Sequence, residues 1–380
     1  MRRRIGRFLW GVASVAVMAA VGWSPVLGAE PIRIGLVHSM TSPFAILGVV
    51  QKDAAVQAVD EINAKGGIRG RKVELIVEDS ANSNTVALAA LNKVLDRDPV
   101  AILGPIWGTQ VLAMLPVIGK EKVPFLVTSG TRKITQQGVP WIFRYFPHDG
   151  ITKAAYTKFA VEELKRRRVG ILHVANEYGM SGRDVILKTL KKLGIKPVAI
   201  ESHNATDKDM TAQLLRLKKA GADVILSQAH VQDTALIIKQ QRQLGIDIPH
   251  VASSAASLPV MRKLVGNKLI AGIYVETAAL PQADPDPKVQ AWGKEYKRRF
   301  KKTGDAFALL YYDMTRMLLE AIRQAGTDRN AIRDWLRKNR FRGLATTYVC
   351  DPEGNCNHKA VILRHDEKGA RIVKTYDFTP

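Results

Sequence analysis

Short apolar runs rich in β-branched residues alternate with longer amphipathic segments along most of this chain. The first series has apolar runs at 32–37, 72–78, 100–103 and 124–128, with helical patterns at 48–64, 84–95 and 109–120. A second series has apolar runs at 169–174, 197–201, 223–227, 248–252 and 272–275, with helical patterns at 150–165, 179–193, 208–219, 231–244 and 258–265. Such alternation is typical of parallel sheets with crossover helices. The sequence therefore predicts an α/β protein with two units in tandem.

The last quarter of the chain departs from this rhythm. A proline-rich break at 281–287 precedes helical patterns at 288–302, 306–325 and 329–338, and then β-rich stretches at 346–349, 359–364 and 371–376. The 306–325 segment has apolar residues on all sides, so it needs an extensive partner surface. We expect it to pack back on the first unit. Repeated crossings between the units would form a hinge beside a cleft.

Residues 1–28 have the three parts of a secretory signal. Four arginines, the last of them Arg7, precede an apolar stretch at 8–21, and Gly28 offers a small residue for cleavage. The apolar stretch is shorter than a typical membrane span. We predict export to the periplasm with cleavage of this signal peptide; an uncleaved anchor is the alternative.

The chain is strongly basic, with a net charge of +22 over 380 residues. The signal holds four arginines and no acidic residue, which leaves 53 basic and 35 acidic residues, or +18. These basic residues are spread over many helices and are not gathered with aromatic residues in one module, so we expect no nucleic-acid partner. A solvated basic face is the favoured interpretation, and attraction to anionic membrane surfaces or ligands is the alternative.

The two cysteines, Cys350 and Cys356, flank the turn sequence Asp-Pro-Glu-Gly-Asn. In an oxidising compartment such a pair is expected to form a structural disulfide. The spacing is not Cys-X-X-Cys, and a zinc site using His358 would need further ligands. We therefore predict a disulfide and no metal.

Motifs of catalysis and nucleotide binding are absent from the sequence. The glycine-rich connector at 66–70 lacks both the P-loop lysine and the Gly-X-Gly-X-X-Gly spacing. Neither Gly-X-Ser-X-Gly nor His-Glu-X-X-His occurs, and the eight histidines are scattered. The sequence therefore argues against an enzyme and predicts no cofactor.

Several segments occur together in a specific order and spacing: 32–36, 41–48 (Thr-Ser-Pro-Phe-Ala-Ile-Leu-Gly), 60–70, 75–79, 102–105, 123–131 and 177–179 (Glu-Tyr-Gly). In this combination the chain resembles the type I periplasmic solute-binding proteins of the branched-chain amino acid (Leu/Ile/Val-binding) class, which serve ABC importers. The resemblance implies two Rossmann-like lobes joined by a three-segment hinge. Lobe 1 would comprise 30–147 and 278–341, and lobe 2 would comprise 148–277 and 342–380.

The resemblance also implies a ligand site between the lobes, at Thr41, Ser42, Phe44, Trp107, Gly108, Thr109, Ser129, Gly130, Thr131, Tyr178, His230 and Ser254. Gly108 stands where the family usually has a serine, which leaves the amides of 108 and 109, at a helix start, to hold a ligand carboxylate. Trp107 either stacks on a flat ligand or packs within its lobe. His230 either covers the ligand or is a surface residue.

One departure from the family bears on the ligand class. Many relatives carry an acidic residue for the ligand's ammonium near the position of Ser253 and Ser254, where this chain has no carboxylate. A buried ammonium without an anionic partner is costly. We therefore expect a carboxylate, an aromatic acid or an amide in preference to an ordinary amino acid.

These observations predict a non-catalytic, monomeric periplasmic receptor. It would capture a small-molecule ligand (a carboxylate, an aromatic acid, an amide or an amino-acid-like compound) in the interlobe cleft and present it to the membrane permease of an ABC importer. A ligand-sensing component for a chemoreceptor or a sensor kinase is the alternative.

Overall fold

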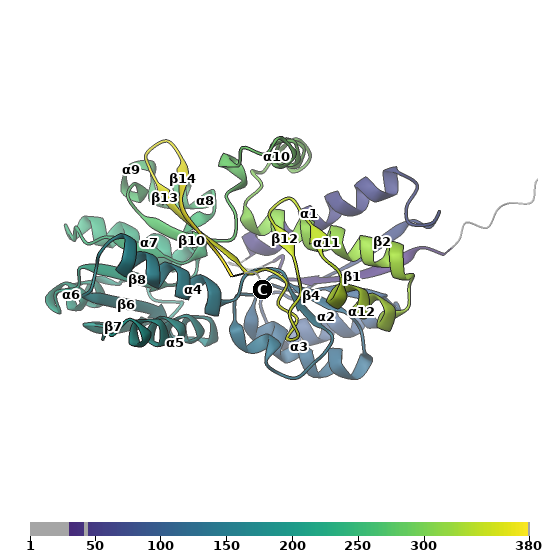
Figure 1. Ribbon diagram of the computed structural model, residues 1–380, viewed down its shortest axis with the longest axis horizontal. Coiled ribbons are helices and arrows are strands. Elements are labelled where there is room, and N and C mark those ends of the chain that lie inside the picture. Colours follow the sequence, from purple (N-terminus) through teal and green to yellow (C-terminus); the bar gives the residue numbers. More distant parts are fainter. Residues whose placement is uncertain (1–29, 42–44, 379–380) are drawn as a thin grey trace, which may run out of the picture.

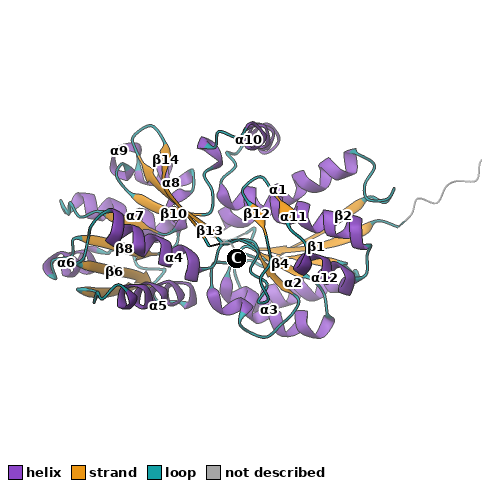
Figure 2. Cartoon of the chain, in the orientation of Figure 1, coloured by secondary structure: helices purple, strands orange, loops and turns teal. Residues whose placement is uncertain are grey.

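A computed structural model describes residues 30–41 and 45–378 of the chain. Its two large sheets define two lobes along the long axis (Figure 1), and β11 (Phe341–Arg342) and β12 (Thr347–Tyr348) form a separate two-stranded sheet. Helices lie on both sides of each large sheet (Figure 2). The predicted signal at 1–28 and the predicted ligand residues Ser42 and Phe44 lie outside the described residues. Among the residues that are described, no helix is both long enough and apolar enough to span a membrane.

The first sheet has five parallel strands in the order β2-β1-β3-β4-β5. They are β1 (Ile32–His38), β2 (Val73–Asp79), β3 (Ala101–Leu103), β4 (Phe125–Val127) and β5 (Ile142–Arg144). Side chains alternate between the two faces of a strand, so Ile34 and Val37 of β1 belong to different core clusters. The pattern of apolar runs predicted the first four strands. It missed β5, which is only three residues long.

Two layers of helices cover this sheet. Helices α1 (Ala45–Ala64) and α11 (Ala306–Ala325) pack on one face, and α2 (Asn84–Leu95) and α3 (Gly108–Glu121) on the other. The prediction that the 306–325 helix returns to the first unit is confirmed. Its Tyr311 hydroxyl donates a 3.0 Å hydrogen bond to the carbonyl oxygen of Gly104, which follows β3. Helices α10 (Pro287–Phe300) and α12 (Arg329–Lys338) lie beside them.

The second sheet has seven strands in the order β14-β13-β10-β9-β8-β6-β7. They are β6 (Val169–Val174), β7 (Ala199–His203), β8 (Val224–Gln228), β9 (His250–Ala252), β10 (Tyr274–Thr277), β13 (Lys359–His365) and β14 (Ala370–Asp377). The last two pair antiparallel, and the others are parallel. Helices of this lobe are α4 (Asp149–Lys158), α5 (Glu177–Lys192), α6 (Thr211–Lys219), α7 (Val231–Gln243), α8 (Val260–Val265) and α9 (Asn267–Ile270).

The chain passes between the two sheets three times, after β5, after β10 and before β13. The predicted disulfide between Cys350 and Cys356 is present, and its loop lies on β5, where the Cys356 amide donates a 2.8 Å hydrogen bond to the Arg144 carbonyl. Residues 344–356 thus bond to the first lobe. A division near residue 357 fits these contacts better than the predicted boundary at 342; the domain limits themselves stay a prediction.

Arg144 organises this crossing although it is fully buried. Its guanidinium donates to the Arg132 carbonyl at 3.0 Å and to the Thr135 hydroxyl at 2.9 Å. These bonds tie the loop after β4, which contains the short helix η1 (Arg132–Thr135), to the end of β5. Burial lowers the pKa of Arg144 to about 9, so the side chain stays charged at neutral pH. The loop that contains Gly130 and Thr131 is therefore held in place at the edge of the cleft.

Candidate functional site

A cavity of about 60 Å³ lies between the two lobes, where carboxyl-terminal strand ends of both sheets meet. In open α/β sheets ligands bind at this end of the strands. The walls come from α1, α3, α4, α5, α7, α11 and the loops after β3, β4, β5, β8 and β9. The lining residues are Leu47, Ile106, Trp107, Gly108, Thr128, Gly130, Thr131, Phe146, Asp149, Lys153, Tyr178, Ala229, His230, Val231, Ser254, Ala255 and Phe307. The cavity is therefore mostly apolar, with its charged groups supplied by α4.

Seven predicted ligand residues line this cavity: Trp107, Gly108, Gly130, Thr131, Tyr178, His230 and Ser254. Thr109 lines an adjoining outer hollow of about 190 Å³. Ser129 is buried next to Gly130 but lines neither space. Thr41 also lies outside both, because its hydroxyl donates to the Asp79 carboxylate at the end of the neighbouring strand. The structure thus brings most of the predicted residues together, while their contact with a ligand stays a prediction.

Gly108 is the first residue of the 14-residue helix α3, at the point where the helix meets Thr131 of the opposite loop. The first amides of a helix have no acceptor within the helix and attract anions. A Cβ at position 108 would overlap the Thr131 hydroxyl and lie 2.7 Å from its Cβ atom. Only glycine permits this approach, which leaves the amide and the Thr131 hydroxyl on the cavity surface.

An aromatic group closes the cavity toward the outer hollow. Trp107 of the first lobe meets the His230 ring edge-on, with centroids 5.6 Å apart, and His230 stacks on Tyr178 at 5.1 Å. Burial lowers the pKa of His230 to about 4, so its ring is neutral at physiological pH. The three rings line both spaces and so form the partition between them. Trp107 therefore packs across the lobes and does not pack only within its own.

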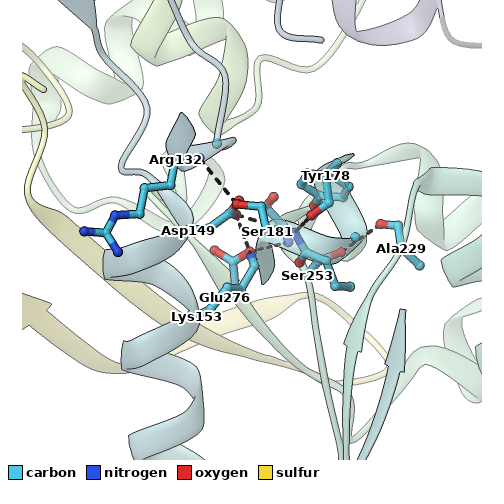
Figure 3. A network of polar contacts seen from close by, with 12 residues as sticks. Arg132, Asp149, Lys153, Tyr178, Ser181, Ala229, Ser253 and Glu276 are labelled. Carbon is cyan, nitrogen blue, oxygen red and sulfur yellow. Dashed lines mark hydrogen bonds and ion pairs between the residues drawn. The ribbon is translucent and has the colours of Figure 1, made fainter. Parts of the chain in front are cut away.

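Three buried charged side chains at the cavity floor were not predicted from the sequence. Asp149 begins α4, Lys153 follows one turn later, and Glu276 lies on β10; each is at most 1% exposed. Figure 3 shows the three pointing toward one another. The Lys153 ammonium forms an ion pair with Glu276 and lies 3.9 Å from an Asp149 oxygen. With both carboxylates ionised, the cluster carries one surplus negative charge.

Hydrogen bonds fix the two carboxylates of the cluster in place. The Ser181 hydroxyl of α5 donates to Asp149 at 2.6 Å, and the Ser254 amide donates to Glu276 at 2.9 Å. Burial raises the pKa of Asp149 to about 6, against the opposing effect of Lys153. For Lys153, burial lowers the pKa, but the neighbouring carboxylates, chiefly Glu276, outweigh it and leave the pKa raised. Lys153 therefore stays protonated at neutral pH, and the Asp149 carboxyl group changes its protonation state near pH 6.

The expectation that this site lacks a carboxylate is wrong. Strand β10 pairs with β9 so that Val275 lies opposite Ala252, which places Glu276 beside the Ser253–Ser254 turn. Glu276 thus reaches the Ser254 amide from the neighbouring strand, 22 residues away in sequence. Asp149 adds a second carboxylate directly on the cavity wall. Asp149 is thus the carboxylate that reaches the cavity, and Glu276 lies behind it, paired with Lys153.

Comparison with known proteins identifies the family to which this chain belongs. The model of the family described as periplasmic binding protein matches residues 31–370. This protein belongs to that family of substrate-binding proteins. The leucine-, isoleucine-, valine-, threonine- and alanine-binding protein of Pseudomonas aeruginosa is 29% identical over 373 residues, which cover 96% of this chain and 93% of that protein.

Solved structures agree on the two-lobed fold. A leucine-binding protein from Thermotoga maritima superposes with a TM-score of 0.83 at 25% identity, covering 91% of this chain and 99% of that one. An ABC transporter solute-binding protein from Rhodopseudomonas palustris, in complex with p-hydroxybenzoic acid, superposes with a TM-score of 0.84 at 18% identity, covering 92% and 98%. The type I periplasmic binding protein fold predicted from the sequence is thus confirmed.

Metal chemistry finds no support in the described part of the chain. No group of three or more His, Cys, Asp or Glu side chains there is arranged to hold a metal ion. The Asp149–Glu276 pair instead has Lys153 between its carboxylates.

Proposed function

We propose that this protein is the periplasmic receptor of an ABC importer, exported by its signal at 1–28. It captures a small zwitterionic solute, such as an amino acid, that carries a carboxylate, an amine and an apolar side chain. It acts without catalysis and as a monomer, closing its lobes on the solute and presenting the closed form to a membrane permease.

One observation carries the ligand class: sites for opposite charges lie next to each other in an apolar cavity. The Gly108 amide and the Thr131 hydroxyl offer donors for a carboxylate. Asp149 lies beside Gly130, the residue before Thr131, where its Oδ1 would be 3.3 Å from an added Cβ. The surplus negative charge of the Asp149–Lys153–Glu276 cluster is therefore one residue away from the anion donors. This spacing supports an α-amino acid, whose two charged groups share one carbon.

The apolar walls favour an aliphatic or aromatic side chain. Leu47, Ile106 and Val231 line the cavity, and Phe146 stacks on Phe307 with centroids 5.0 Å apart. Burial of such a side chain gains about 25 cal/mol for each Å² removed from water. A cavity of 60 Å³ is smaller than the roughly 150 Å³ that holds a benzene ring. We therefore infer that the lobes part to admit the solute.

A thermal-shift screen of the chain from Glu30 onward, with amino acids and their des-amino analogues, tests this function. A ligand at 100 times its Kd stabilises the native state by about 2.7 kcal/mol, which corresponds to a rise in Tm of several degrees. We expect leucine-like amino acids to give this rise. Absence of any shift across the amino acids, with turnover of one of them, would contradict a receptor.

Two alanine variants of the same helix localise the binding. Gly108→Ala should weaken ligand binding at least about tenfold, because the new Cβ displaces Thr131. Gly119→Ala is the matched control: it lies on α3 too, and its Cβ would meet nothing closer than Val139 at 3.7 Å. Equal affinity of both variants would move the anion site away from α3.

The alternative, a ligand-sensing component for a chemoreceptor or sensor kinase, uses the same cleft and differs only in the partner. Uptake of labelled ligand by cells with and without the gene separates the two. Loss of uptake supports the importer, whereas retained uptake with loss of a response to the ligand supports the sensor.

A further inference from the structure

A second hollow, of about 520 Å³, lies on the first lobe between α1, α10 and α11. The first two of these helices are adjacent in Figure 1. This α1–α10–α11 groove shares no lining residue with the interlobe cavity. It is therefore a separate feature, and its chemistry is independent of the proposed function.

Aromatic side chains form one wall of the groove. Trp292 of α10 lies 6.0 Å from the Tyr312 ring of α11, and Phe341 follows α12 at the groove's end. Trp292 is only 4% exposed, and its indole N–H has no hydrogen-bond partner within the described residues. The carbonyl oxygen of the Gln57 side chain, also in the groove lining, has none either. Both atoms are enclosed in the wall and are not exposed to the groove, so Trp292 and Gln57 support the groove from behind its surface.

The acidic side chains of the groove are already engaged. Glu61 accepts hydrogen bonds from Gln57 and from the Tyr312 hydroxyl. Glu295 and Glu320 pair with arginines three residues further along their own helices. Glu295 and Glu320 are thus paired, although Arg316 also attracts Glu320. Glu61 keeps its negative charge, because both of its donors are neutral.

Three basic side chains of the groove have no ion-pair partner in the described part of the chain: Lys65, Lys288 and Arg316. Arg316 is the best positioned, because its guanidinium lies 5.6 Å over the Tyr312 ring and 5.8 Å over the Phe341 ring. Asp313, one turn earlier, accepts 2.8 Å hydrogen bonds from two backbone amides that follow β11 (Phe341–Arg342). The two rings hold the guanidinium in place, and it attracts Asp313 and Glu320 without forming a contact ion pair with either.

We propose that the α1–α10–α11 groove binds an aromatic carboxylate as a second ligand. The carboxylate takes the donors of Arg316, since a guanidinium matches a carboxylate in geometry and charge. The ring lies against Phe341 and the apolar side chains of Leu319 and Leu344, where aromatic contact adds to apolar burial. The uncommitted charge of Lys65 and Lys288 at the rim excludes cationic solutes and attracts anions.

Indole N–H signals in ¹⁵N NMR test this site with 2-naphthoate as the probe. Of the six tryptophans, Trp107, Trp141, Trp292 and Trp335 follow residue 30, so the chain from Glu30 gives four such signals. Trp292 reports on the groove and Trp107 on the interlobe cavity. We expect saturable movement of the Trp292 signal, which Trp292→Phe identifies by removing it.

Substitutions of Arg316 test whether its charge binds the carboxylate of the probe. Arg316→Gln should weaken 2-naphthoate binding about tenfold or more, and Arg316→Lys should recover part of the loss. Arg323→Gln, on the same helix, is the matched control, because that arginine is already paired with Glu320; it should change affinity less than about threefold. The uncharged probe 2-naphthalenemethanol should bind more weakly than the carboxylate.

Three results would overturn the proposal. Movement of the Trp107 signal instead of Trp292 would place the probe in the interlobe cavity. Equal effects of Arg316→Gln and Arg323→Gln would show that only general surface charge matters. If the Trp292 signal does not move at millimolar 2-naphthoate, the groove does not bind aromatic carboxylates.

Discussion

Lys153 is the side chain whose loss should most affect the stability of this protein. It is 1% exposed and lies between two carboxylates that are equally buried, Asp149 and Glu276. Lys153→Met keeps the length and apolar stem of the side chain but removes its charge. The variant leaves two carboxylates facing each other without a cation, in a region that water reaches poorly.

The size of the effect follows from this geometry. Removal of one partner of a buried ion pair costs about 3–5 kcal/mol, mostly because the other charge stays buried and unpaired. Replacement of both partners by apolar residues is often close to neutral. We therefore expect Lys153→Met to lower the free energy of unfolding by about 3–5 kcal/mol, and the double variant Lys153→Met with Glu276→Leu to lower it by less.

Urea unfolding followed by circular dichroism at pH 7 and pH 5 measures both variants. In Lys153→Met the folded-state pKa of Asp149, already raised by burial, should rise further, because repulsion from the neighbouring carboxylate replaces attraction by the ammonium. A group with a raised folded-state pKa adds stability at low pH that is lost as the pH rises through that value. The loss in free energy of unfolding caused by Lys153→Met should therefore be larger at pH 7 than at pH 5. A loss below about 1 kcal/mol, or equal losses at both pH values, would refute the reasoning.

Three further predictions concern other parts of the molecule. Because the pKa of Asp149 is about 6, affinity for an amine-bearing ligand should fall as the pH drops below 6, and Asp149→Asn should abolish that dependence in calorimetric titrations. Replacing Cys350 and Cys356 by serine should lower the free energy of unfolding by about 2 kcal/mol; an unchanged urea midpoint would contradict this. Tyr311→Phe removes a buried hydrogen bond and should cost about 1 kcal/mol in the same assay.

The fold was largely predictable because its signals are local. Apolar runs of β-branched residues predicted most strands of both sheets, and the uniformly apolar 306–325 helix predicted its own return to the first lobe. The short strand β5 gave no such signal. The contacts of 344–356 with the first lobe were also not predicted, since Arg144 and the loop around Asn355 meet only through the tertiary fold.

The Asp149–Lys153–Glu276 cluster could not be predicted from local sequence patterns. An Asp and a Lys at positions i and i+4, such as Asp149 and Lys153, are typical of an exposed helix face. Glu276 lies more than a hundred residues further on, and only the β9–β10 register places it beside Ser254. A systematic search for polar residues at the ends of adjacent parallel strands would have found Glu276. The premise that no carboxylate lies near Ser254 was therefore wrong, while the ligand class itself stays a prediction.

The most direct test of the central claim is a pair of calorimetric titrations of the chain from Glu30 onward. Leucine and 4-methylpentanoate have the same carbon skeleton and carboxylate, and differ only in the amine that we assign to the Asp149–Lys153–Glu276 cluster. Leucine should bind at one site per chain and at least about tenfold more tightly than the analogue. Equal or tighter binding of 4-methylpentanoate would show that the cluster does not recognise an amine.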